Sequence, residues 1–408
     1  MKMTKYKLSE LVEVTRGASL SGQFYAEEGK LIRLTLGNFN MNGGGFKENT
    51  SKTDLYFTGT VRDEFILNEG DIITPLTEQS LGLLGTTARI PESGKYIQSQ
   101  DVALVRCKKG LLDPNFCYYL ISSSIVRQQL SAAAQQTKIR HTSPEKIKDC
   151  TVWVPDFDVQ KNIGRILTDI DNKIAINRQI NDNLEAMAKQ LYDYWFVQFD
   201  FPNEEGKPYK SNGGAMVWNE KLKRDIPQGW SDCILGDICD MYQPKTLGLN
   251  DLSEDSEYKV YGANGIIGHY SSYNHENSEI AMACRGNSCG TINRTSPKSW
   301  ITGNAMVIKF RNKEIHNEYI KQALKYANVK GAISGSGQPQ LTRENLSLLK
   351  MTQPNYEILE AFSKKVAAIV AMELEIEEQN DNLTKQRDEL LPLLMNGQAT
   401  VNYHLSAC

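Results

Sequence analysis

Hydrophobic side chains recur in a heptad pattern over two separate stretches of the chain. In the first stretch, apolar positions alternate in steps of four and three residues from Ile163 to Trp195, and the second stretch repeats this from Phe362 to Leu394. This spacing places one stripe of side chains along one face of a helix and is typical of coiled coils. Pro392 and Gly397 mark the end of the second helix. A helix of about 37 residues is roughly 55 Å long, so each would extend beyond a compact domain.

The two predicted helices belong to an internal repeat. The tetrapeptide N-D-N-L occurs at Asn181 and again at Asn380, and this offset of 199 holds without a gap for residues 143–196. A weaker echo relates Leu8–Leu11 to Leu235–Ile238 with an offset of 227. Because the two offsets differ, the halves share their ends and diverge in their middle segments. The chain therefore consists of one module–helix unit written twice.

Short β-type runs bounded by Gly, Asn and Ser fill both middle segments. The predicted strands are Ile32–Phe39, Asp71–Leu76 and Asp101–Cys107 in the first, and Tyr258–Tyr270, Glu279–Gly286 and Asn304–Phe310 in the second. A shorter helical run follows each set (Asn115–Leu130; Asn317–Val329), and then a polar loop (Gln135–Thr142; Gly335–Leu341). The pattern predicts an α+β protein with two α/β modules separated by two long antiparallel helices.

The predicted domains follow this order. They are a first module (1–155), a central helix (156–199), a linker (200–234), a second module (235–354), a C-terminal helix (355–396) and a tail (397–408). Asn181 and Asn380 fall within the heptad seams, where a polar residue sets register rather than adding stability. We expect the helices to pair about a pseudo-twofold axis near these two residues.

The net charge of the 408 residues, −3, conceals opposite local charges. Residues 1–150 hold 19 basic and 16 acidic side chains, net +3, and residues 235–354 hold 13 and 11, net +2. The helical segments are acidic, with 5 and 8 (net −3) over residues 156–200 and 4 and 9 (net −5) over residues 355–408. A chain that contacted phosphates along its whole length would be basic throughout. The modules could therefore touch DNA while the helices face protein.

Recognisable catalytic motifs are absent from the sequence. There is no G-x-x-x-x-G-K-[ST] loop for ATP, no N-P-P-Y or D-P-P-Y tetrapeptide of an adenine methyltransferase, and no C-x-x-C among the eight cysteines. We therefore expect no catalysis, metal or cofactor on this chain. The polar start M-K-M-T-K-Y-K and the lack of an 18-residue apolar run favour a cytoplasmic protein.

Several segments outside the modules resemble one known family. They are N-D-N-L-E-A-M-A-K-Q-L-Y-D-Y-W-F-V-Q-F-D-F-P (Asn181–Pro202), G-K-P-Y-K-S-N-G-G (from Gly206), I-P-Q-G-W (Ile226–Trp230), G-S-G-Q-P-Q-L (Gly335–Leu341) and L-L-P-L-L-M-N-G (Leu390–Gly397). These segments are similar to the specificity subunits of type I restriction–modification systems. The resemblance implies that each module is a target recognition domain for one half of a bipartite DNA site, with the helices as a spacer. It further implies methyltransferase subunits carrying S-adenosylmethionine and translocase–nuclease subunits using ATP and Mg²⁺.

Base readout needs Arg, Asn, Gln or Lys side chains aimed at base edges. The candidates are Arg16, Asn38, Gln79, Lys138, Arg140 and His141 in the first module, and Lys245, Asn264, Arg285, Asn287, Gln338, Gln340 and Arg343 in the second. Two other classes stay open at this point. An enzyme is opposed by the missing motifs, whereas a coiled-coil scaffold without DNA specificity fits the heptads and the acidic helices.

Overall fold

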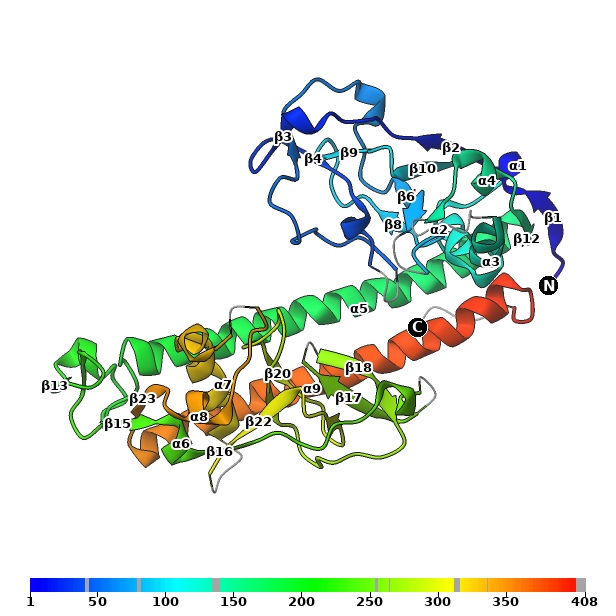
Figure 1. Ribbon diagram of the computed structural model, residues 1–408. Helices are drawn as coiled ribbons and strands as arrows, with labels where there is room; N and C mark the ends of the chain where they lie inside the picture. Colours follow the sequence, from blue (N-terminus) through cyan, green and yellow to red (C-terminus); the bar gives the residue numbers. More distant parts are fainter. Residues whose placement is uncertain are drawn as a thin grey trace. The chain divides into compact units, whose positions relative to one another are not determined.

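The computed structural model describes residues 1–400 except 41–43, 79–81, 134–139, 254–255, 264, 312–315 and 336. The chain forms two compact units (Figure 1). The first unit consists of Met1–Ile176 with Gln379–Cys408, and the second is Asn177–Glu378. Each unit therefore holds one module together with parts of both long helices.

The two long helices predicted from the heptads are α5 (Phe157–Tyr192) and α9 (Tyr356–Met395). A π-helical turn, Asp193–Val197, continues α5. None of the twenty predicted heptad positions is exposed. These positions are Ile163, Leu167, Ile170, Ile174, Asn177, Asn181, Leu184, Ala188, Leu191 and Trp195 on α5, and Phe362, Val366, Ile369, Glu373, Ile376, Asn380, Leu383, Arg387, Leu390 and Leu394 on α9. The predicted seam is thus the buried face of both helices.

The helices are antiparallel within each unit. In the first unit, Ile163 near the start of α5 shares a hydrophobic core with Leu394 near the end of α9. In the second unit, Trp195 just beyond α5 shares a core with Phe362 near the start of α9. Asn181 also crosses the seam of the second unit, where its Nδ2 donates to the backbone oxygen of Glu373 at 3.3 Å. Asn380 belongs to the first unit, so the axis near both asparagines stays a prediction.

The remaining elements of the first unit are β1 (Thr4–Lys7), α1 (Leu8–Leu11), β2 (Val12–Arg16), β3 (Tyr25–Ala26), β4 (Leu31–Arg33), β5 (Tyr56–Phe57), β6 (Ile72–Pro75), β7 (Thr77–Glu78), β8 (Ala88–Arg89), β9 (Tyr96–Ile97), β10 (Val102–Cys107), α2 (Pro114–Ser122), α3 (Ser124–Ala133), β11 (Arg140–His141), α4 (Pro144–Lys148) and β12 (Thr151–Val154). Those of the second unit are β13 (Met216–Asn219), β14 (Arg224–Pro227), β15 (Ser231–Ile234), α6 (Leu235–Ile238), β16 (Cys239–Tyr242), β17 (Tyr258–Gly262), β18 (Gly265–Tyr270), β19 (Ile280–Ala283), β20 (Ile292–Arg294), β21 (Trp300–Ile301), β22 (Ala305–Phe310), α7 (Asn317–Tyr326), α8 (Arg343–Ser347) and β23 (Lys350–Gln353).

The two modules share one topology. Each contains an antiparallel four-stranded sheet, with order β2-β10-β6-β8 in the first and β16-β22-β19-β20 in the second. Each is also closed by a two-stranded ladder between its ends, in which Thr4 pairs with Val154 and Ser231 with Gln353. These two pairs are related by the same offsets, 227 and 199, that the sequence repeat shows. The repeat is therefore a repeat of tertiary structure.

One predicted strand is wrong over most of its length. Of Ile32–Phe39, β4 keeps only the first part, and Leu36–Asn38 forms a 3₁₀ turn. The Asn38 side chain causes the difference, because its Oδ1 accepts the backbone N–H of Thr35 at 2.9 Å. Local side-chain bonds of this kind compete with strand pairing.

Candidate nucleic-acid interface

The candidates of the first module gather at one edge of its four-stranded sheet. At this edge β2 and β6 end and the antiparallel β10 begins, so that Arg16 pairs with Ala103 and Pro75 with Val102. Arg16 is exposed, and its Nε donates to the backbone oxygen of Gln100 at 2.8 Å. The guanidinium is therefore held at the edge while the rest of the side chain remains accessible.

A two-residue ladder brings the polar loop before α4 to the same edge. Strand β6 leads into β7, which pairs with β11 so that Arg140 lies opposite Glu78 and His141 opposite Thr77. The next backbone bond, from Thr142 N to Leu76 O, measures 2.8 Å. His141 is exposed at this point. Residues 60 positions apart in the sequence thus form one polar surface.

A buried carboxylate fastens this ladder. Glu78 is 2% exposed, and its Oε1 lies 3.1 Å from Nη1 of Arg140. Its Oε2 accepts the backbone N–H groups of Leu83 and Leu84, each at 3.0 Å. Burial lowers the pKa of the neighbouring Arg127, and the negative charge of Glu78 opposes that shift. Glu78 therefore ties the chain after β7 to the loop that carries Arg140.

The second module repeats this arrangement with different side chains. Its ladder joins Arg285 to Gln340, and Leu341 N donates to Cys284 O at 2.9 Å. Leu341 stands 199 residues after Thr142, so the two backbone bonds are equivalent in the repeat. Where the first module has Glu78, the second has a glycine whose N–H bonds to Pro339 O at 3.0 Å. The exposed candidates at this ladder are Arg285, Asn287, Gln338 and Gln340.

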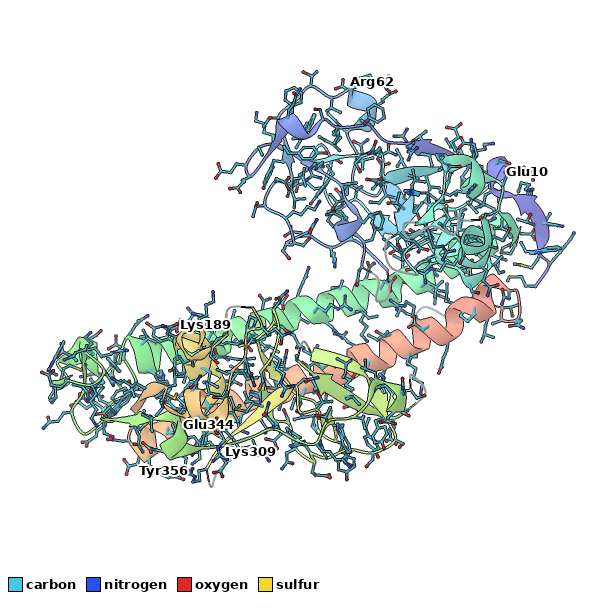
Figure 2. All side chains as sticks on the ribbon, viewed as in Figure 1. Glu10, Arg62, Lys189, Lys309, Glu344 and Tyr356 are labelled. Atoms are coloured by element: carbon cyan, nitrogen blue, oxygen red, sulfur yellow. The ribbon has the colours of Figure 1, made fainter. Side chains whose placement is uncertain are left out.

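Two further candidates of the second module lie near this edge. Lys245 is exposed in the loop after β16, and Gln243 in the same loop donates to Gly303 O at 3.1 Å, just before β22 begins. Arg343 is exposed at the start of α8, next to Glu344, which Figure 2 labels. The edge where β16 and β19 end therefore carries several basic and amide side chains.

Comparison with known proteins assigns the chain to a family. The sequence profile described as the type I restriction modification DNA specificity domain matches residues 1–186 and 227–384. The chain belongs to this family. It is 22% identical over 380 residues to the type I restriction enzyme HindI specificity subunit of Haemophilus influenzae, covering 74% of this chain and 81% of that protein. It is 21% identical over 376 residues to the MjaVIII specificity subunit of Methanocaldococcus jannaschii, covering 85% and 83%.

A solved structure shows the same fold. The S subunit of the type I restriction–modification system from M. genitalium aligns with a TM-score of 0.59 and 18% identity, covering 97% of this chain and 96% of that one. The fold class expected from the sequence is thereby confirmed: two α/β modules with long helices. As a member of the specificity-subunit family, the chain is a DNA-recognition protein.

The structure gives one candidate of this specificity subunit a different role. Asn38 is 2% exposed, and its Nδ2 donates to Lys47 O at 3.2 Å while its Oδ1 holds the turn at Thr35. A side chain that is buried and bonded on both its amide atoms stabilises a turn. Gln79, Lys138 and Asn264 lie outside the described residues.

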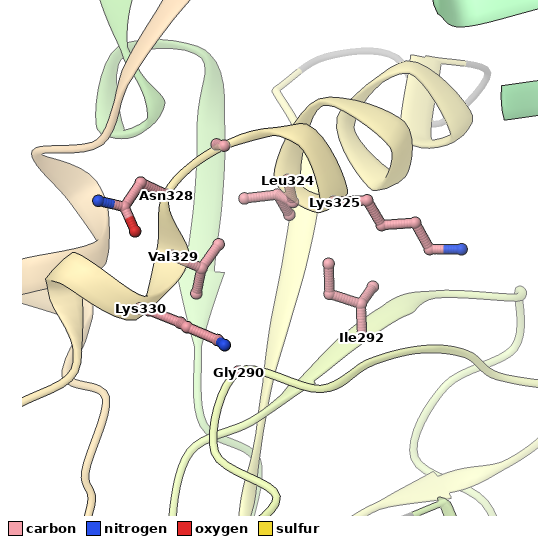
Figure 3. Close-up of a pocket in the computed structure, with 8 residues that line it drawn as sticks. Gly290, Ile292, Leu324, Lys325, Asn328, Val329 and Lys330 are labelled. Atoms are coloured by element: carbon pink, nitrogen blue, oxygen red, sulfur yellow. The ribbon is translucent and has the colours of Figure 1, made fainter. Parts of the chain in front are cut away.

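Two residues of the edge were missed in the sequence. Glu78 was overlooked, although an acidic residue directly before Gln79 at a strand end is a signal for a loop anchor. Lys330 was overlooked in a short 3₁₀ turn, Val329–Ala332. It is exposed and lines a cavity of about 350 Å³ (Figure 3). Gly290, Ile292, Leu324, Lys325, Ala327, Asn328 and Val329 form the rest of the lining.

Neither metal nor membrane chemistry emerges from the described residues. Within the described ranges, no group of three or more His, Cys, Asp or Glu side chains could hold a metal ion. No helix in that part of the chain is both long and apolar enough to cross a bilayer. The seven cysteines that the structure describes are free thiols, and Cys408 lies outside the described residues.

Proposed function

We propose that each module reads one half of a bipartite DNA site through the polar edge of its four-stranded sheet. The single observation that supports this is the repeated ladder, which Thr142 and Leu76 form in one module and Leu341 and Cys284 in the other. Its backbone is the same in both modules, whereas its side chains differ. A common scaffold with different polar groups is what two different half-sites require, since hydrogen bonds to base edges carry the sequence information.

The long helices then act as the spacer between the half-sites and as the docking surface for methyltransferase subunits. The net charges of −3 and −5 over residues 156–200 and 355–408 support protein rather than DNA as their partner. Trimming or lengthening both helices by whole heptads would change the spacer without changing either half-site.

The chemistry of the complex belongs to its other subunits in this proposal. Methyltransferase subunits would bring S-adenosylmethionine, and restriction or translocase subunits would bring ATP and Mg²⁺. The chain itself is a non-catalytic subunit that binds double-stranded DNA and acts in the cytoplasm, where that DNA is found.

Replacement of a module tests the proposal. Residues 235–354 are exchanged for the corresponding module of another family member, and the full chain is assembled with its methyltransferase subunits. The bound or methylated sequence is then determined on a library of random duplexes. We expect one half of the site to change and the other to stay the same. Alteration of both halves, or of neither, would contradict the modular readout.

A further inference from the structure

Each module of this chain sits on its long helices through charged and polar contacts that differ between the two units. In the second unit, α7 presents Lys321 and Lys325 to Glu185 of α5. Lys321 is paired with Glu185, and Lys325 Nζ lies 2.5 Å from Glu185 Oε1. Gln322 of the same helix donates to Glu185 Oε1 at 2.8 Å. Lys321 and Gln322 are 5% and 2% exposed, so these contacts lie in the interior of the unit.

A second set of contacts joins the same module to α9. Arg294 of β20 is paired with Glu318 of α7, and its Nε lies 4.0 Å from Glu373 Oε2. His316 Nδ1 lies 2.7 Å from Ser363 Oγ, and both residues are fully or almost fully buried. A charged group buried this deeply is tolerated only when it keeps its partners. We call the helix residues Glu185, Ser363 and Glu373 the second seat.

The first module uses other helix positions. Tyr119 of α2 donates to Asp171 Oδ2 at 2.6 Å, and Arg387 of α9 bonds to Asp171 Oδ1 at 2.9 Å. Nearby, α2 approaches α5 so closely that a Cβ on Gly164 would lie 2.7 Å from both Asn115 Cβ and Phe116 N. No side chain fits there without displacing α2. We call Gly164, Asp171 and Arg387 the first seat.

The repeat shows that the seats do not match each other. An offset of 199 relates each position of one seat to a different residue in the other half of the chain. The pairs are Gly164 with Ser363, Asp171 with Val370, Ile174 with Glu373, Glu185 with Thr384, and Ala188 with Arg387. The heptad positions are mostly apolar in both halves, so these polar positions distinguish them.

We infer that the two seats are mutually exclusive docking surfaces, each of which accepts only a module with the complementary polar residues. In the first seat, the second module would bring Lys321 against Thr384 and Arg294 against Ile174, leaving buried charges unpaired. In the second seat, the first module would press Asn115 and Phe116 onto Ser363 and offer Tyr119 a valine. A module arriving by recombination must therefore carry the polar set of the seat that it enters. The inference concerns module seating and holds whatever DNA the modules read.

Exchange of the two modules within the full chain tests the inference. In the exchanged chain, residues 4–154 and 231–353 trade places, so each sheet still closes with its own end strands. In the reseated chain, the five residue pairs given above are exchanged as well, for example Gly164→Ser with Ser363→Gly. The native chain with the same five exchanges is the matched control, since its modules would then meet the wrong seats.

Amide hydrogen exchange of α2 and α7 reports seating, because each of these peptides occurs once in every chain. We expect both helices to exchange faster, by about tenfold or more, in the exchanged chain and in the control than in the native chain. The reseated chain should recover the native protection. Native protection in the exchanged chain would overturn the inference, and so would a reseated chain no better protected than the exchanged one.

Discussion

Arg140 Nη1 lies 3.1 Å from Oε1 of the buried Glu78, across the ladder that joins β7 to β11. The arginine that the sequence marks as a base reader is thus bonded to a carboxylate of its own module. Its alanine variant would therefore report two effects at once, the loss of a positive charge and the stranding of a buried negative one. Residues without such a partner are better probes of DNA readout.

Arg140→Ala should destabilise the first unit. Glu78 would keep its charge in a site that is 2% exposed, and breaking a buried pair typically costs about 3 kcal/mol or more. Chemical denaturation, with amide exchange of α3 to identify the unit, measures the loss. The double variant Arg140→Met with Glu78→Gln should recover most of it, and His141→Ala, which changes an exposed neighbour, should be nearly neutral. A stable Arg140→Ala chain would show that the pair does not fasten the ladder.

Arg285→Ala should weaken DNA binding without changing stability. The side chain is exposed, and its ladder contact with Gln340 is made by the backbone. Loss of one base or phosphate contact costs about 1–3 kcal/mol, roughly tenfold or more in affinity. Titration of the selected duplex at two salt concentrations measures the effect. Lys364→Ala removes an exposed charge from α9 and serves as the control. Equal losses in the two variants would remove Arg285 from the interface.

Gly164→Ala should loosen the first module from α5. The added Cβ would lie 2.7 Å from the backbone nitrogen of Phe116, and such overpacking costs about 1–3 kcal/mol. The drop in the midpoint of thermal unfolding measures it. Gly337→Ala is the matched control, because its added Cβ meets nothing within 4 Å. Similar midpoints for the two variants would mean that α2 can move away without loss.

His275 should make the second unit sensitive to acid. Burial, with a smaller contribution from the charge of Lys309, lowers the pKa of the imidazole to about 4. Nε2 lies 2.9 Å from the Tyr242 hydroxyl, and the two rings stack. Because the free imidazole titrates near 6.5, its contribution is present above that pH and is lost as the pH falls towards 4.

The variant His275→Gln isolates this contribution. The stability difference between wild type and variant should narrow progressively from pH 6.5 to pH 4, as followed by denaturant titration of the second unit. Above pH 7 the difference should be constant. A difference independent of pH over the whole range would show that the imidazole does not titrate with folding.

Much of the architecture is readable from the sequence because it depends on local periodicity. The heptads from Ile163 and Phe362 predict both long helices, since a stripe of apolar side chains has one buried solution in a helix. The offset of 199 likewise predicts that both modules end in the same way, and the pairs Thr4–Val154 and Ser231–Gln353 confirm it. The irregular turn at Asn38 escaped prediction, because a side-chain bond to Thr35 replaced the strand that β-type residues favour.

By itself, the sequence determined the two-fold repetition, the amphipathic helices and the opposite charges of modules and helices. Periodicity and composition are properties of the chain that need no folding to be seen. Only the tertiary structure decided which polar residues meet, because Arg140 and Glu78, or Arg285 and Gln340, come together through non-local sheet pairing. Folding likewise decided that Asn38 is buried and that Asp171 and Glu185 hold different modules. Such contacts follow from packing between distant segments, and no local pattern encodes them.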